Sequence, residues 1–285
     1  ARIRLPALVV YVAVLNDGVS REMEWEHLRR LPGQEGLTLE QLSGNFQRLR
    51  FANHTLKWER HTEFTRYSLV QALPDKAMQG CSDEEMIAEL VIDPQWLAQI
   101  PGRTIAAILL AMVHGDVDDP SAMRAQAAPW INDPAILASL LGIRRSCAMT
   151  NFELRDSGFE RILVISPPNT SELRSGRTSQ RLLELETYRI MALRGLPVAK
   201  DLSAMLGESE NQLAEITAEM ENTEASDQDL LNQLIGLAAR VERATAKHMY
   251  RFSATEAYHN LVEQRITQLR ETPIPGTQSI GEFMQ

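Results

Sequence analysis

The chain has 285 residues, of which 44% are hydrophobic and 24% charged, and its formal net charge at pH 7 is −9. This length suits one compact domain plus an extended element. The acidic excess argues against a nucleic-acid partner, because phosphate binding along a strand needs clustered Lys and Arg.

The only two cysteines, Cys81 and Cys147, form no CxxC pair, and no secretory signal precedes them. Free thiols in a reducing compartment are therefore expected. The longest apolar runs are far shorter than the ~20 residues that a membrane span needs. We expect a soluble domain on the cytoplasmic side.

Residues 1–166 predict an α/β (α+β) domain with a mixed sheet of about six strands and flanking helices. Leu8–Leu15 is a continuous apolar run closed by Asn16-Asp17-Gly18, which is typical of a central strand buried on both faces. Alternating polar and apolar residues in Thr55–Arg60 and Phe64–Leu69 predict an antiparallel pair. The other expected strands are 105–113, 143–154 and 160–165, the last two joined by a hairpin turn at 156–158.

Short helices are expected between these strands. Arg21–Arg30 is amphipathic, and Thr38 with Gln41 has the spacing of a capping box. Asp93 caps another short helix that begins at Pro94. Residues 114–134 predict a long surface loop with some helix.

From about Ser171 to Arg270, Gly and Pro are sparse and apolar residues recur at helical spacing, which predicts a long antiparallel helical hairpin. The first helix is expected at 171–222 and the second at 227–270, with residues 223–226 as the turn. The second helix alone would be about 65 Å long. Gly195 and Pro197 predict a kink near Leu196.

The seam of a coiled coil is expected between the two helices. In the second helix it comprises Leu230, Leu234, Leu237, Val241 and Ala244, and in the first Leu206, Leu213, Ile216 and Met220.

Further along the second helix the seam admits large and polar residues, so this half is expected to rest on the α/β domain or on a neighbouring subunit. These residues are His248, Phe252, Tyr258, His259 and Arg265. The facing part of the first helix carries Glu184, Glu186, Tyr188 and Arg189, and we expect Glu186 to pair with Arg265. The pattern favours a homo-oligomer.

Glu59, His61 and Glu63 are the first candidate metal ligands. In an extended strand they would project from one face about 7 Å apart, a spacing that suits a divalent metal. A hairpin turn within this stretch would break the alignment and leave a solvated, salt-bridged sheet face, which is the alternative interpretation.

Asp116, Asp118 and Asp119 are the second candidates, since their carboxylates suit Mg²⁺ or Ca²⁺. They lack the Gly and the final Glu of an EF-hand, so a plain acidic loop is the alternative. No cofactor is established by the sequence; if one binds, Mg²⁺ or another divalent cation is expected. The chain has no GxSxG, Walker, GxGxxG or HExxH motif, so we expect no enzymatic activity.

Several strings resemble a known family along nearly the whole chain. They are Trp58–Phe64 (WERHTEF), Gly158–Val164 (GFERILV), Leu182–Leu193 (LLELETYRIMAL), Tyr250-Arg251-Phe252 with Ala257-Tyr258, and Gly281-Glu282-Phe283. These resemble the bacterial domain of unknown function family 3422, whose members are regarded as membrane-anchored. The resemblance implies a further C-terminal helix, of which residues 277–285 would be the start, leading to a hydrophobic segment outside this chain.

The order of elements is also similar to that of CorA-type magnesium channels, a likeness of layout alone. The leading hypothesis is a cytoplasmic, non-enzymatic assembly or regulatory module of a protein anchored in the inner membrane. The alternative is a domain that senses divalent cations or regulates their transport. Residues expected to have structural or interface roles are Trp58, Arg60, Glu186, Tyr188, Arg189, Tyr250, Arg251, Phe252, Tyr258 and Arg265.

Overall fold

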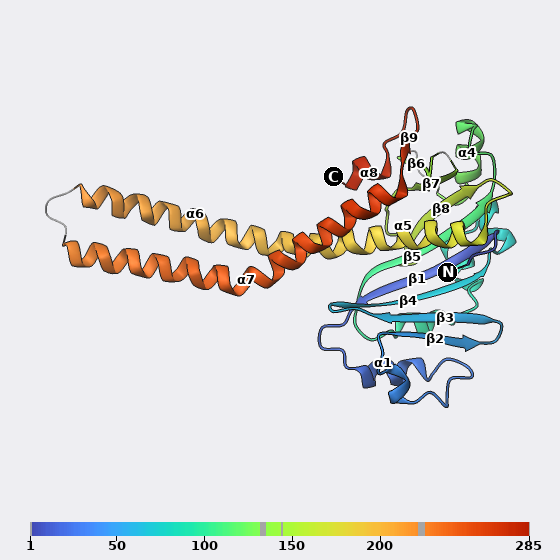
Figure 1. Ribbon diagram of the computed structural model, residues 1–285, viewed down its shortest axis with the longest axis horizontal. Helices are drawn as coiled ribbons and strands as arrows, with labels where there is room; N and C mark the ends of the chain where they lie inside the picture. Colours follow the sequence, from blue (N-terminus) through green and yellow to red (C-terminus); the bar gives the residue numbers. More distant parts are fainter. Residues whose placement is uncertain (1, 132–134, 144, 222–225, 285) are drawn as a thin grey trace. The chain divides into compact units, whose positions relative to one another are not determined.

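A computed structural model describes residues 2–131, 135–143, 145–221 and 226–284 (Figure 1). The chain divides into two compact units. The sheet unit comprises residues 1–187 and 263–285, and the hairpin unit comprises residues 188–262. Most of the turn expected at 223–226, and the end of the loop expected at 114–134, lie outside the described residues.

The sheet unit contains a mixed sheet, as the sequence predicts, but the described residues form nine strands rather than six, in the order β2-β3-β4-β1-β5-β8-β7-β6-β9. Only β5 and β8 pair in parallel. The strands are β1 (Ala7–Leu15), β2 (Phe46–Phe51), β3 (His54–Arg60), β4 (Phe64–Ala72), β5 (Arg103–His114), β6 (Leu137–Leu141), β7 (Ser146–Thr150), β8 (Glu160–Ser166) and β9 (Thr272–Pro273).

The predicted central strand is β1, which pairs with β4 on one side and β5 on the other and is buried along its whole length. The predicted antiparallel pair is β3 and β4. The strand expected at 143–154 is shorter, because Gly142 and Ile143 have positive φ and form a turn between β6 and β7. The strands β2, β6 and β9 were not predicted.

Helices cover both faces of the sheet. The helices are α1 (Arg21–Leu28), α2 (Asp83–Ala88), α3 (Pro94–Ala98), α4 (Pro120–Ala127), α5 (Glu172–Leu193), α6 (Gly195–Met220), α7 (Asp227–Leu269) and α8 (Ile280–Met284), with 3₁₀ turns η1 (Leu39–Leu42) and η2 (Asp75–Gln79). The predicted capping box of Thr38 and Gln41 is present in η1.

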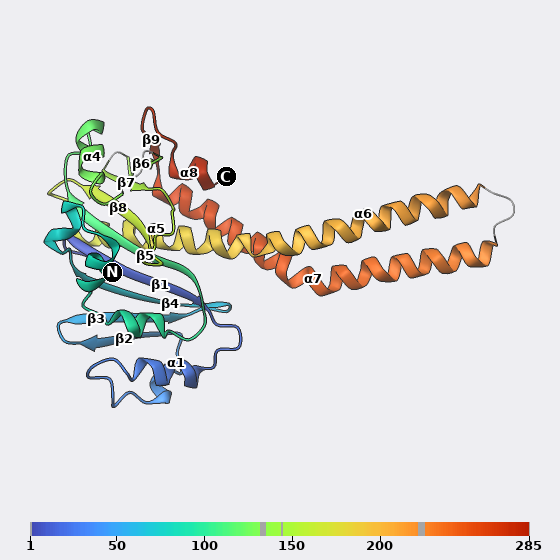
Figure 2. The same ribbon diagram turned by 180° about the vertical axis from the view of Figure 1, so that it is seen from behind.

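One face of β1 presents Leu8, Val10, Val12 and Val14 to the main core, to which helices α1 to α4 contribute apolar side chains. Tyr11 projects from the opposite face, because side chains alternate along a strand, and its hydroxyl lies 2.8 Å from Thr187 Oγ1 on α5. The part of α5 within the sheet unit crosses this second face, as Figure 2 also shows. The first turns of α5 are thereby placed near one end of the sheet.

The hairpin unit contains α6 and residues 227–262 of α7, which run antiparallel. The predicted single helix 171–222 is divided, since α5 ends at Leu193 and α6 begins at Gly195. Pro197 lies in the first turn of α6, where its missing N–H costs no helical hydrogen bond. The division therefore falls next to the predicted kink.

The hairpin's own core is smaller than predicted. Ile216 packs with Leu230 and Leu237, and Leu234 lies against this cluster. On α6, however, the predicted seam residues Leu206, Leu213 and Met220 are exposed by 44%, 47% and 62%. These three residues are less buried than seam positions should be, although Leu206 lines a groove together with Val241 and Ala244 of α7. A heptad spacing identifies an apolar stripe and does not say which helix covers it.

Candidate functional site

A cleft of about 620 Å³ lies in the sheet unit, formed by three separate parts of the chain. These parts are the turn between β6 and β7, the first three turns of α5, and the C-terminal end of α7. Gly142 N donates to Leu269 O at 2.9 Å, so the turn and the end of α7 are directly joined. The cleft therefore has a backbone framework that belongs to one unit.

Five arginines line the cleft: Arg145, Arg174, Arg177, Arg181 and Arg270. Those of α5 are three and four residues apart, which places them on one helical face. No acidic side chain belongs to the described lining. Apart from Arg181, these arginine side chains have no hydrogen-bond or ion-pair partner in the described part of the chain. The cleft thus concentrates uncompensated positive charge in an acidic protein.

Arg181 is the half-buried arginine at the inner side of this cluster. Its Nη1 donates to Gln268 O at 2.9 Å, a carbonyl of the last turn of α7. Burial lowers the pKa of Arg181, and repulsion from Arg177, Arg265 and Arg270 lowers it further. An anion bound in the cleft would relieve that repulsion.

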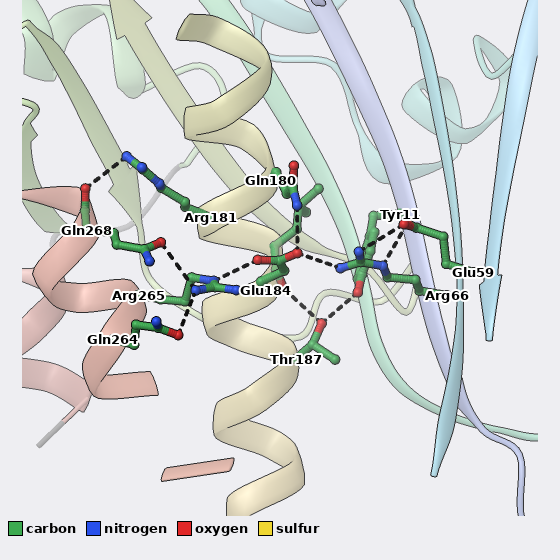
Figure 3. A network of polar contacts seen from close by, with 11 residues as sticks. Tyr11, Glu59, Arg66, Gln180, Arg181, Glu184, Thr187, Gln264, Arg265 and Gln268 are labelled. Atoms are coloured by element: carbon green, nitrogen blue, oxygen red, sulfur yellow. Dashed lines mark hydrogen bonds and ion pairs between the residues drawn. The ribbon is translucent and has the colours of Figure 1, made fainter. Parts of the chain in front are cut away.

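A buried ion network lies behind the arginines and joins α5, the end of α7 and β4 (Figure 3). Its centre is Glu184, whose side chain is 5% exposed. Arg66 Nη1 donates to its Oε1 at 3.0 Å, and Arg265 Nε donates to its Oε2 at 2.7 Å. Arg66 also makes two hydrogen bonds to Glu59, at 2.8 and 3.1 Å. The network fixes the two helices whose residues line the cleft.

Glu184 remains ionised in this environment. Burial alone would raise the pKa of its carboxyl, but the hydrogen bond from Gln180 and the charge of Arg66 hold it below the usual value. The Glu184 carboxylate is therefore shared by two guanidinium groups, of which Arg66 is also paired with Glu59. The positive charges of Arg66 and Arg265 are paired with carboxylates within the protein, whereas those of the cleft arginines are available to a ligand.

The backbone of the cleft is strained at two non-glycine positions. Ile143 has φ 63° and Arg270 has φ 48°, both in the left-handed region that favours glycine. Arg270 directly follows α7, the position at which a helix commonly ends with a left-handed residue, usually Gly. Strain of this kind costs ~1–3 kcal/mol per residue and is found most often at functional sites. An arginine here is consistent with a role for its guanidinium group.

These groups are suited to bind an anion. A guanidinium makes paired, charge-assisted hydrogen bonds to phosphate or carboxylate oxygens. The N-terminal turn of α5 adds a partial positive charge, and the hydroxyls of Ser171 and Thr178 supply further donors. The described lining contains no His, Cys, Asp, Glu, Lys or Tyr side chain. The arrangement provides binding groups without an evident general base or nucleophile.

The first predicted metal group does not lie on one strand face. Glu59 belongs to β3, whereas His61 and Glu63 lie in the turn before β4. Glu59 is paired with Arg66, and the His61 ring stacks on Phe64 at 4.5 Å. The alternative interpretation, a turn within the stretch beside a salt-bridged sheet face, describes this region better.

The second predicted metal group has local structural roles. Asp116 Oδ1 accepts from Asp118 N at 2.8 Å, and Asp119 caps α4 by accepting from Ser121 N at 2.8 Å. Among the described residues, no group of three or more His, Cys, Asp or Glu side chains is placed to hold a metal ion.

Residues with predicted structural roles in the sheet unit are placed as follows. Trp58 is fully buried in β3. Arg60 Nη1 pairs with Glu24 Oε2 at 2.6 Å. Arg265 Nε lies 2.7 Å from Oε2 of Glu184, and its predicted pairing with Glu186 stays a prediction. Glu186 is itself fully buried.

In the hairpin unit, Tyr188 and Tyr258 have ring centroids 6.1 Å apart. Tyr250 and Phe252 are exposed by 64% and 39%. Arg189 and Arg251 are partly buried.

The arginine cleft was not predicted. Its members come from residues 145, 174–181 and 270, so no single motif contains them. The one signal in the sequence is the spacing of Arg174, Arg177 and Arg181, which puts three cations on one face at the start of a helix.

A family model described as "Protein of unknown function (DUF3422)" matches residues 1–285. The chain belongs to this family. No curated protein and no solved structure was found to match the DUF3422 chain. Within its described ranges, none of its helices combines the length and apolar character needed to cross a bilayer.

Proposed function

We propose that this DUF3422 protein is a non-enzymatic regulatory module whose sheet unit binds a phosphoryl-bearing anion in the arginine cleft. The observation that supports this most strongly is the set of five arginines around one cleft of about 620 Å³ with no acidic side chain in its described lining. Structural arginines are normally paired, as Arg66 is with Glu59 and Glu184. Unpaired guanidinium groups gathered on one wall are what a multiply charged ligand requires.

The ligand is expected to carry more than one negative charge. A single carboxylate would engage only one or two of the five guanidinium groups. A diphosphate, or a phosphomonoester beside a second phosphoryl group, presents enough oxygens for Arg174, Arg177 and Arg181 together. The same chemistry is offered by a soluble phosphorylated metabolite and by the headgroup of an acidic phospholipid.

The proposal includes a place on the cytoplasmic side of the bacterial inner membrane, attached through a segment outside this chain. The family resemblance is what supports this placement. Regulation of cation transport, the alternative function, stays a prediction. The acidic residues suggested for it, such as Glu59 and Asp119, have protein partners instead.

The test is isothermal titration of the whole chain with pyrophosphate at low ionic strength. Saturable binding is expected, and the double substitution Arg174→Gln with Arg177→Gln should weaken it by at least about tenfold, since each charge-assisted hydrogen bond contributes ~1.5–3 kcal/mol. Both arginines are exposed, so the fold should be unaffected. The matched control is Arg103→Gln, an exposed arginine outside the cleft.

A second arm distinguishes the two ligand sources. The chain is sedimented with vesicles of phosphatidylcholine containing phosphatidic acid, and with vesicles of phosphatidylcholine alone. Binding of pyrophosphate without vesicle binding identifies a soluble ligand, and competition between the two identifies a headgroup. Failure of the wild-type chain to bind either probe would overturn the proposed function.

A further inference from the structure

The hairpin unit leaves an apolar surface uncovered. Ten of its large apolar side chains are exposed, whereas its own core contains Ile216, Leu230 and Leu237, with Leu234 against them. The exposed residues are Leu193, Leu196, Leu206, Leu213, Met220, Leu231, Ile235, Met249, Tyr250 and Phe252.

Seven of these ten exposed residues follow a heptad repeat, three on α6 and four on α7. On α6, Leu206, Leu213 and Met220 are separated by seven residues each. On α7, Leu231 with Ile235 and Met249 with Phe252 occupy equivalent positions of the repeat, because 231 and 252 are three heptads apart. A stripe with this period fits the side chains of another helix at knobs-into-holes spacing.

One residue of the α6 stripe and two residues of the α7 stripe meet in a groove between the helices. The groove has a volume of about 330 Å³, and its lining includes Leu206 of α6 together with Met249 and Phe252 of α7. Polar contacts also join the two helices. Arg240 Nη2 donates to Ser209 Oγ at 3.1 Å and to Gln212 Oε1 at 2.9 Å. The groove has the form that a further helix fills in a four-helix bundle.

Charge along the hairpin unit identifies the occupant. Residues 201–236 contain nine acidic residues and no Lys or Arg, a formal charge of −9. Residues 188–200 and 237–262 contain seven Lys or Arg and two Glu, a formal charge of +5. The hairpin unit therefore has an acidic half and a basic half. Two copies laid antiparallel put each acidic half beside the other's basic half, whereas parallel copies would oppose like charges.

We infer that the hairpin unit docks against the hairpin unit of a second copy of this chain, antiparallel, with the stripe of Leu206, Leu213 and Met220 buried in the contact. The inference is independent of the proposed anion site, since the two rest on different residues. The second copy would provide the helix that covers the apolar stripe of α6.

The first experiment is the mass of the whole chain by light scattering after size exclusion, compared with 32.1 kDa for one copy. At micromolar concentration a mass of two copies is expected. The substitution Leu213→Gln should raise the dimer Kd at least about tenfold, by loss of a buried apolar anchor. Leu154→Gln, which changes an exposed leucine of the sheet unit, should leave the Kd unchanged. A monomeric wild-type chain would overturn the inference.

Charge reversal tests the antiparallel arrangement. Glu215→Lys with Glu219→Lys should dissociate the dimer, and adding Arg243→Glu with Lys247→Glu in the same chain should restore it. In a parallel dimer each half of the hairpin unit lies beside the same half of its partner. Like charges would then meet in the fourfold variant as well, so the added substitutions would not strengthen the dimer. Restoration therefore supports the proposed pairing, and its absence, with the melting temperature unchanged, contradicts it.

Discussion

Arg265 near the end of α7 donates its Nε to Oε2 of Glu184 in the middle of α5, at 2.7 Å. This ion pair joins the two helices whose residues line the arginine cleft, and Glu184 is held in turn by Arg66 from β4. The cleft therefore depends on a buried charge that the sheet itself positions.

Replacing Glu184 with Gln should lower the free energy of unfolding by about 3 kcal/mol at pH 7, because it removes the buried carboxylate that pairs with both Arg265 and Arg66 and leaves Arg66 with Glu59. Urea unfolding of the two chains measures this. The exposed pair of Lys76 and Glu89 offers the control, since Glu89→Gln should cost less than about 1 kcal/mol. Equal losses for the two substitutions would contradict the importance assigned to Glu184.

The stability of the sheet unit should also depend on pH through His27. This residue is 3% exposed, stacks on Trp96 at 4.1 Å, and has a pKa lowered to about 4 by burial and by the charge of Arg30. Because the unfolded chain binds the proton near pH 6.5 and the native chain only near pH 4, stability falls as the pH drops through this range. The expected contribution is about 3 kcal/mol.

The measurement is the urea midpoint between pH 7.5 and 4.5. His27→Phe keeps an aromatic ring against Trp96 and should remove most of this slope. His61, whose pKa is also lowered first by burial, contributes in the same direction and should account for the remainder. A wild-type slope unchanged by His27→Phe would show that His27 is not the group that titrates.

Arg270→Gly separates binding from folding. A left-handed residue after a helix is better tolerated as Gly, so the substitution should raise the free energy of unfolding by up to about 1 kcal/mol. The same substitution should weaken pyrophosphate binding, because it removes one guanidinium group from the cleft. Arg270→Ala, which loses the charge and keeps the strain, should weaken binding equally without the gain in stability.

We expect Mg²⁺ to leave the melting temperature of the chain unchanged. A ligand bound only by the native state would raise the melting temperature. A Mg²⁺ concentration of about 5 mM exceeds the Kd expected of a weak carboxylate site. Thermal unfolding with chelator and then with Mg²⁺ decides the matter. A rise that is lost in Asp116→Asn with Asp118→Asn would favour the cation-sensing alternative.

The sequence predicted those parts of the fold in which one local pattern dominates. The unbroken apolar run of β1 and the alternation in β3 and β4 identify strands directly. The missed strands lack such patterns. Phe46–Phe51 is an edge strand that alternates only over its last four residues, and Leu137–Leu141 is a short buried run of four apolar residues and one serine. Periodicity alone does not separate a short apolar run from helix.

The candidate site was harder to predict, because its charge is assembled from distant segments. Arg145 and Arg270 line the cleft because of the tertiary arrangement of β6, β7 and α7. In the sequence, the segment from Glu59 to Glu63 was a stronger candidate for a functional site than the cleft arginines. In the structure, Glu59 is instead paired with Arg66. The ion pair of Glu59 with Arg66 could not be distinguished beforehand from a metal ligand, since both need a carboxylate on a strand.

The most direct test of the anion site is a crystal of the whole chain soaked in tungstate, a phosphate analogue with a strong anomalous signal. The account predicts tungstate in the cleft, within hydrogen-bond distance of the Arg177 and Arg181 side chains. A cleft without tungstate at saturating concentration, or tungstate bound only elsewhere on the molecule, would contradict it.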